Sequence, residues 1–143
     1  MCLYTRQLWL RKARKPLKGY KFVAVGDNER FSPYVGTTIP SPCLSGEQCY
    51  EPETKSRLEF DYSDLMFIAN GGFIHFFTDI MAARCCILKY AMLRQQIKKL
   101  ELWEVEIPRG TKYALGSGSN NKKSIYWGTC GAAHAIKFIR KIE

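Results

Sequence analysis

Hydrophobic and polar residues alternate in several short stretches of this chain. Residues 20–25, Tyr-Lys-Phe-Val-Ala-Val, alternate and are rich in residues that favour β-structure, so they predict a strand. Residues 102–107 alternate with period two, which predicts a half-buried strand with Glu104 and Glu106 on its solvent face. Residues 73–77 form a short apolar run around one histidine and predict a buried strand.

A helical spacing of apolar residues follows that run and predicts one main helix over about 79–100. Thr78 or Asp79 supplies a side-chain oxygen that can accept from the free N–H groups of the first turn. The expected buried stripe consists of Ile80, Ala83, Ile87, Ala91 and Ile97. Together with the strands, this helix predicts an α+β fold, in which an antiparallel or mixed sheet packs on the helix.

The rest of the chain gives weaker signals. Residues 111–115 predict a short return strand after a Pro-Arg-Gly turn, and residues 125–127 predict an edge strand. The segment 132–142 fits both a helix and a strand, and we favour a strand. Four prolines between 31 and 52 predict a long loop, because proline cannot donate to a strand ladder; such a loop is a candidate contact surface.

A length of 143 residues predicts a single domain, 1–143, with enough aromatic residues for a core. No apolar run approaches the roughly 20 residues that span a bilayer, so we expect no membrane partner. The first residues are basic but lack an apolar segment and a small-residue cleavage site, which argues against a secretory signal. We therefore expect an intracellular protein.

Charge adds the clearest functional signal. The chain holds 22 Lys and Arg against 13 Asp and Glu, a net charge of +9, and residues 1–19 form a basic N-terminal arm. Such a domain attracts polyanions. Trp9 lies within the arm, and aromatic faces beside cations suit base stacking; the alternative is that the aromatics are core and the charge only confers solubility. The residues expected to contact an anion are Arg11, Lys12, Arg14, Lys15 and Lys18, with Lys122 and Lys123.

The chain carries no established catalytic signature. His75 is either a general base or ligand-reading residue that titrates near neutral pH, or a core histidine that bonds a backbone group. Glu104 and Glu106 form either a carboxylate pair or a solvated strand face. A zinc site at Cys43 and Cys49 does not match the usual ligand spacings, so we expect reduced thiols, no metal and no cofactor.

A series of short motifs resembles small proteins encoded by tailed phages of gut bacteria. The motifs begin with Met-Cys-Leu-Tyr-Thr at 1–5 and continue through Tyr20-Lys21, Ser32-Pro33-Tyr34, Gly-Phe-Ile-His-Phe-Phe at 72–77, Ala82-Ala83 and Val-Glu-Ile-Pro-Arg-Gly at 105–110. That family has its histidine two residues after the glycine. Here two residues separate Gly72 from His75, which reverses the sheet face of the histidine unless a bulge absorbs the change.

The order of strands and helix also resembles the ADP-ribosyltransferase-like fold. That resemblance would place Tyr20, His75 and Glu104 or Glu106 at the functional positions. From residues and resemblances together, we expect a phage-type accessory protein in the cytoplasm of a bacterial host or in the virion. It would bind an anionic partner, nucleic acid or a nucleotide-like ligand, without turnover. The alternatives are a structural virion component that contacts phage or host proteins, and an ADP-ribosyltransferase-like enzyme or inactive relative.

Overall fold

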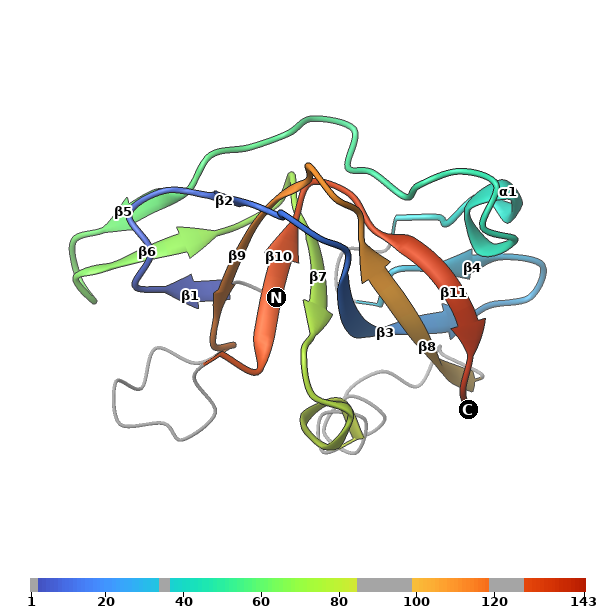
Figure 1. The fold of residues 1–143 in the computed structure, drawn as a ribbon. Coiled ribbons are helices and arrows are strands. Elements are labelled where there is room, and N and C mark those ends of the chain that lie inside the picture. Colours follow the sequence, from blue (N-terminus) through green and yellow to red (C-terminus); the bar gives the residue numbers. More distant parts are fainter. Residues whose placement is uncertain (1–2, 34–36, 85–98, 119–127) are drawn as a thin grey trace.

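The fold is built from antiparallel strands (Figure 1). The computed structural model describes residues 3–33, 37–84, 99–118 and 128–143. Its strands are β1 (Leu3–Thr5), β2 (Arg11–Lys12), β3 (Leu17–Val25), β4 (Arg30–Phe31), β5 (Glu59–Asp61), β6 (Met66–Ala69), β7 (Ile74–Phe77), β8 (Lys99–Ile107), β9 (Lys112–Gly116), β10 (Cys130–Ala133) and β11 (Lys137–Lys141). A four-residue helix, α1 (Ser41–Leu44), and a helical turn at 80–84 complete the described elements.

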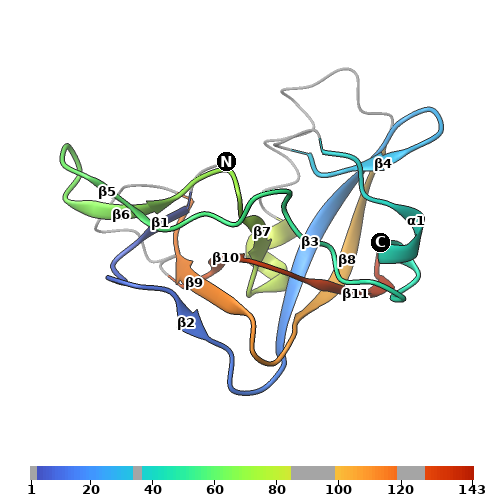
Figure 2. The same cartoon turned by 90° about the horizontal axis from the view of Figure 1, so that it is seen from above.

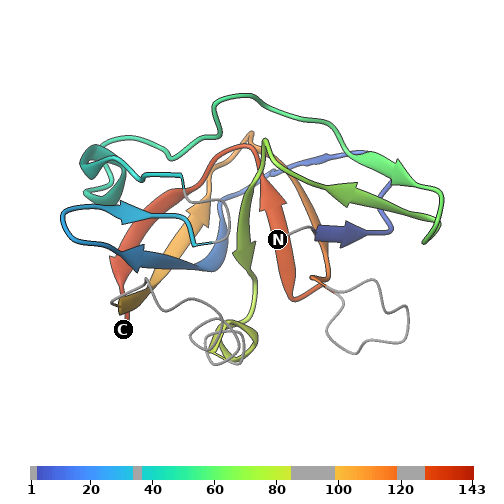
Figure 3. The ribbon, with the colours of Figure 1, turned by 180° about the vertical axis from the view of Figure 1, so that it is seen from behind.

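The larger sheet is organised around β3 and β8. Its order is β11-β8-β3-β7-β10-β9-β2, and β4 pairs with β3 outside this path. The neighbouring strands β3 and β8 pair over nine positions, from Leu17 opposite Ile107 to Val25 opposite Lys99. By contrast, β3 and β7 share one pair, Tyr20 opposite Phe77, and then diverge, as Figure 3 shows. The divergence opens the sheet beside β7.

A second, smaller sheet has the order β1-β6-β5. Tyr4 joins it to the large sheet through two backbone hydrogen bonds with Ser117, each 2.8 Å long. This approach is so close that a Cβ on Gly116 would overlap the Tyr4 carbonyl oxygen. Glycine is therefore required at 116 by packing.

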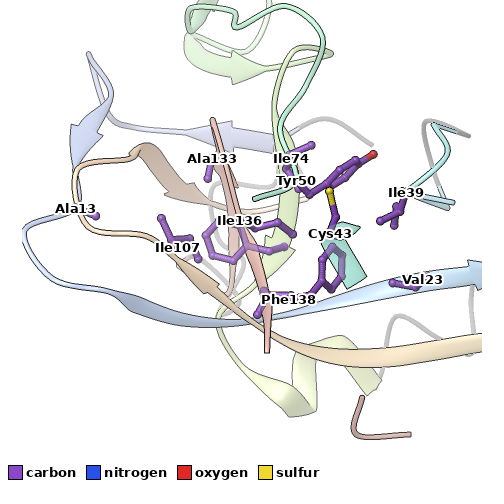
Figure 4. Close-up of a cluster of buried hydrophobic side chains, with 12 residues drawn as sticks. Ala13, Val23, Ile39, Cys43, Tyr50, Ile74, Ile107, Ala133, Ile136 and Phe138 are labelled. Carbon is purple, nitrogen blue, oxygen red and sulfur yellow. The ribbon is translucent and has the colours of Figure 1, made fainter. Parts of the chain in front are cut away.

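Apolar side chains cover both faces of the large sheet. On one face lies the cluster of Figure 4, in which Ile39, Cys43 and Tyr50 pack on side chains of the sheet such as Val23 and Phe138. On the other face, residues of β1, β6 and the turn at 80–84 pack against the sheet; this cluster contains Leu3, Phe22, Ala69, Phe73, Phe77, Ala83, Leu102, Ala114, Cys130 and Ala132. The core is therefore made between sheets and connecting segments.

The prediction of an α+β sheet packed on one main helix is wrong. Within the described residues, the helix expected over 79–100 is helical only at 80–84, and Lys99 already begins β8. Its predicted N-cap is confirmed, because Asp79 Oδ1 accepts from the Met81 N–H at 3.0 Å. The reason for the correction is long-range pairing: Lys99 and Leu100 extend the ladder with β3, and such tertiary contacts outweigh local helix propensity. Residues 85–98 lie outside the described part.

The other sequence predictions can be placed on these strands. The strands expected at 20–25, 73–77, 102–107 and 111–115 correspond to β3, β7, β8 and β9. The segment 132–142 is extended, as favoured, but it is divided between β10 and β11. The strand expected at 125–127 lies outside the described residues.

The predicted basic arm, residues 1–19, and the predicted Pro-rich loop, residues 31–52, both take part in the sheets. Residues 1–19 contribute β1, β2 and the start of β3 where they are described, as Figure 2 shows. Residues 31–52 include α1, with Pro42 in its first turn, and Tyr50 exchanges two backbone hydrogen bonds with Ile136. The Pro-rich segment thereby covers one core cluster.

Candidate functional site

Basic residues of the N-terminal segment gather around an exposed groove. Its lining includes Trp9, Leu10, Leu17 and Tyr113 together with the four cations Arg11, Lys12, Arg14 and Lys15, and its volume is about 560 Å³. Trp9 is 70% exposed although it is among the largest apolar side chains. An exposed indole among cations is an unusual surface for a small domain, because large apolar side chains normally enter the core.

The local fold places these side chains by short pairings. β2 pairs with β9, so that Arg11 lies opposite Tyr113 and Lys12 opposite Lys112. The Ala13 N–H donates to Thr111 O at 2.9 Å, and Ala13 O accepts from the Gly110 N–H at 2.8 Å. These bonds anchor Ala13 in the core, and Arg14 and Lys15 then project from the turn that follows it.

The four cations of the groove are exposed and have no carboxylate partner among the described residues. Lys12 even has a second lysine, Lys112, directly across the ladder. Like charges placed opposite each other destabilise a strand pair slightly. An anion bound in the groove would relieve this repulsion.

Lys18 does not belong to this group. Its Nζ lies 3.0 Å from Glu104 Oε1, and Arg140 approaches the other carboxylate oxygen at 3.4 Å. The hydrogen bond and charge of Glu104 raise the pKa of Lys18, and the bond from Lys18 in turn lowers the pKa of Glu104. Glu104 is therefore a structural ion-pair partner, and Glu106 lies on the same strand face, opposite Lys18 and Lys137.

His75 is buried in β7, 8% exposed. Its Nε2 lies 3.2 Å from the carbonyl oxygen of Ala69. Burial, and next the charge of Lys21, lower the pKa of His75 to about 4, so the ring is neutral at physiological pH. Of the two interpretations of His75, its burial and this contact fit the core histidine that bonds a backbone group.

The three residues suggested by the transferase-like resemblance are only partly brought together. Tyr20 and Glu104 are direct partners in the ladder between β3 and β8. His75 lies on β7 opposite Ala132, with its ring nitrogen engaged by Ala69. Glu104 is already paired with Lys18 and Arg140, so it is not a free carboxylate.

Lys21 lies in the predicted strand 20–25, but it was not predicted to be a buried cation. Its side chain is 5% exposed, and Nζ donates to the carbonyl oxygen of His75 at 2.9 Å. Burial lowers the pKa of Lys21 from 10.5 to about 8. The available signal was the alternation itself, which places Lys21 on the same strand face as Val23.

Two of the expected anion contacts, Lys122 and Lys123, lie outside the described residues. Cys43 and Cys49 are free thiols, and burial raises the pKa of Cys43. Within the part of the chain that the structure describes, three metal-ligating side chains do not come together anywhere.

Comparisons with protein-family models, with curated proteins and with solved structures find no match to this chain. In the described ranges, none of the helical segments has the length and apolar character needed to cross a membrane.

Proposed function

We propose that this protein binds single-stranded nucleic acid through the basic groove and works by binding, without turnover. The observation that carries the proposal is the exposed Trp9 beside Arg11, Lys12, Arg14 and Lys15. Cations of this kind attract the phosphate backbone, and the indole offers a face on which a base can stack. Because stacking needs an unpaired base, the groove favours single strands over duplexes.

The setting of this activity is also a proposal. The motif resemblance described above supports a phage-type accessory protein that acts in the cytoplasm of a bacterial host or in the virion. The alternative role of a structural virion component drew on the Pro-rich segment as a contact loop. That role is less favoured, because Ile39, Cys43 and Tyr50 of this segment are buried in the protein's own core. The transferase-like alternative is less favoured with Glu104 as its carboxylate, because Lys18 and Arg140 hold Glu104 in ion pairs.

Fluorescence anisotropy with labelled oligothymidine tests the proposal. We expect the logarithm of the binding constant to fall linearly with the logarithm of salt concentration, with a slope of about −3 if all four groove cations contact phosphates. The double variant Lys12→Ala/Lys15→Ala should reduce the steepness of that slope by about one unit or more. Trp9→Ala should weaken binding by about 1–3 kcal/mol, the usual contribution of one stacked base.

A matched control removes the same charge elsewhere. Lys99 and Lys137 are exposed, lie at the starts of β8 and β11, and form no ion pair among the described residues. Lys99→Ala/Lys137→Ala lowers the net charge equally and should leave the affinity nearly unchanged. Equal losses in both double variants would mean that net charge alone attracts the strand, and the groove would then have no specific role.

A further inference from the structure

A second cavity lies where β3 and β7 diverge. Its volume is about 400 Å³, and its lining includes Lys21, Ser32, Tyr50, Phe73 and His75. This volume is within the range of roughly 300–1,000 Å³ that is typical of small-molecule sites. Thr37, Glu53 and Thr54 also line the cavity and are exposed, so it opens to solvent on their side.

The wall of this cavity holds a buried cation, Lys21, that has no counter-charge among the described residues. The ammonium of Lys21 can donate three hydrogen bonds, but His75 O is its one acceptor among the described residues. Burial lowers the pKa of Lys21, and none of the described carboxylates forms an ion pair with its ammonium to offset that effect. Glu53 lines the cavity, but it is exposed and forms no ion pair with Lys21 among the described residues.

The contrast with Glu101 shows that the fold can compensate a buried charge. Glu101 is 2% exposed and is met by Arg30 Nε at 2.8 Å, Lys141 Nζ at 3.6 Å and the Trp103 indole N–H at 3.3 Å. Burial alone would raise the pKa of Glu101, but these hydrogen bonds and charges together lower it. Within the described part of the chain Lys21 has no such set of partners, although an unpaired buried charge is costly.

The cavity wall also fits the body of an organic molecule. Phe73, Ile74 and Phe77 supply apolar contact, and Ser32, Thr37 and Ser56 supply hydroxyl groups. Phe73 is held in place by stacking on His134, with ring centroids 5.0 Å apart, and His134 Nε2 is fixed at 2.9 Å from Ser56 O. Glu53 at the rim disfavours a second negative group on the ligand.

We propose that this cavity binds a small organic molecule with one anionic group, a carboxylate or a phosphate, which lies against the Lys21 ammonium while the body of the molecule packs on Phe73. The proposal is independent of nucleic-acid binding in the groove, which uses other residues. The bound anion would accept the hydrogen bonds that Lys21 has left, in a position shielded from water. Charge-assisted bonds of this kind are the stronger ones in proteins.

Three small molecules that share a phenyl ring test this proposal on the full chain. Benzoate and phenyl phosphate differ in their anionic group, and benzamide is the neutral control. Binding is followed by backbone amide NMR shifts at residues that line the cavity. We expect saturable shifts for at least one anion, with a dissociation constant of about a millimolar for so small a molecule, and at least about tenfold weaker binding of benzamide. Saturation by benzoate alone assigns a carboxylate ligand, and saturation by phenyl phosphate alone assigns a phosphate ligand.

Variants of Lys21 separate the proposed contact from general surface attraction. Lys21→Met should weaken anion binding about tenfold or more, Lys21→Arg should retain it, and the groove variant Lys12→Ala should leave it unchanged. If Lys21→Met does not fold, the Lys21→Arg variant and the benzamide comparison on the native chain still decide. Equal binding of benzamide and the anions, no saturable shift with either anion, or undiminished binding by folded Lys21→Met would overturn the proposal.

Discussion

Replacing Lys21 by methionine should change how the stability of the fold depends on pH. Burial lowers the pKa of Lys21 to about 8 in the folded protein, whereas the unfolded chain has the ordinary value of 10.5. Between these values the unfolded state holds a proton that the folded state has lost, so the lysine makes stability rise with pH across this window. At about 1.4 kcal/mol for each pH unit, the rise is on the order of 3 kcal/mol.

Methionine has a similar length and no charge, so the Lys21→Met variant lacks this rise. Below about pH 8 the free energy of unfolding of the variant rises by on the order of 3 kcal/mol, because the buried charge is absent. It falls by about 1–2 kcal/mol because the carbonyl oxygen of His75 no longer receives the hydrogen bond from Nζ. This loss of the hydrogen bond does not depend on pH. The advantage of the variant should therefore shrink by about 3 kcal/mol between about pH 7.5 and about pH 10.5.

Urea unfolding followed by tryptophan fluorescence measures this difference at a series of pH values. Other alkaline groups, including the tyrosines, titrate equally in both proteins and cancel when the variant is compared with the native chain. Lys99→Met is the matched control, because Lys99 is exposed, and its difference from the native protein should not vary with pH. A difference between Lys21→Met and the native chain that is equally flat would refute the argument that Lys21 is desolvated.

Other parts of the fold give three more predictions. The native protein should lose stability on the order of 3 kcal/mol as the pH falls from about 6.5 to 4, because His75 stays neutral in the fold while the unfolded chain gains a proton there. His75→Gln keeps a side-chain N–H donor but cannot titrate, so this loss should be absent from the variant. Acid titrations of circular dichroism check this. Arg30→Ala should destabilise the protein by about 2 kcal/mol in urea at neutral pH, since it removes the shortest bond to the buried carboxylate of Glu101; a loss within error would contradict this role. Gly116→Ala should lower stability by about 3 kcal/mol, because its Cβ would meet a backbone carbonyl of β1, whereas Gly71→Ala, which meets nothing within 4 Å, should lower it little.

Local alternation was sufficient to predict strands β3 and β8 of the large sheet. In β8, Val105 and Ile107 are fully buried and Trp103 packs against the same cluster, as their spacing indicated. The predicted strands 20–25 and 102–107 turn out to be one continuous ladder. What alternation could not supply was the partner of each strand, because pairing depends on contacts between residues far apart in the chain.

The parts that were missed are those whose structure depends on a distant partner. β2 has two residues and becomes a strand only by pairing with β9, about a hundred residues later. β5 contains two acidic residues, Glu59 and Asp61, and it pairs with β6, which in turn pairs with β1. The helix was extended too far because its apolar spacing continued, while Lys99 and Leu100 instead completed the ladder with β3. The sequence indicated the basic cluster, but the selection among its members needed the structure, which separates Lys18 from Arg14 and Lys15 by its bond to Glu104.

Glu101 and Lys21 are both buried and charged, but they differ in how far the fold compensates the charge. The partners of Glu101 allow its charge to remain in the fold at low cost, and such a pair needs no function to explain it. Lys21 is 5% exposed and has one hydrogen-bond acceptor among the described residues. A methionine at this position would retain the packing and remove the cost of burying the charge. A cation kept under these conditions, in the wall of a cavity and beside a neutral histidine, is best explained by an anion that completes its hydrogen bonds. If a bound anion does so, the pKa of Lys21 should return toward its ordinary value in the complex, and the pH dependence of stability attributed to this lysine should disappear when the anion is present.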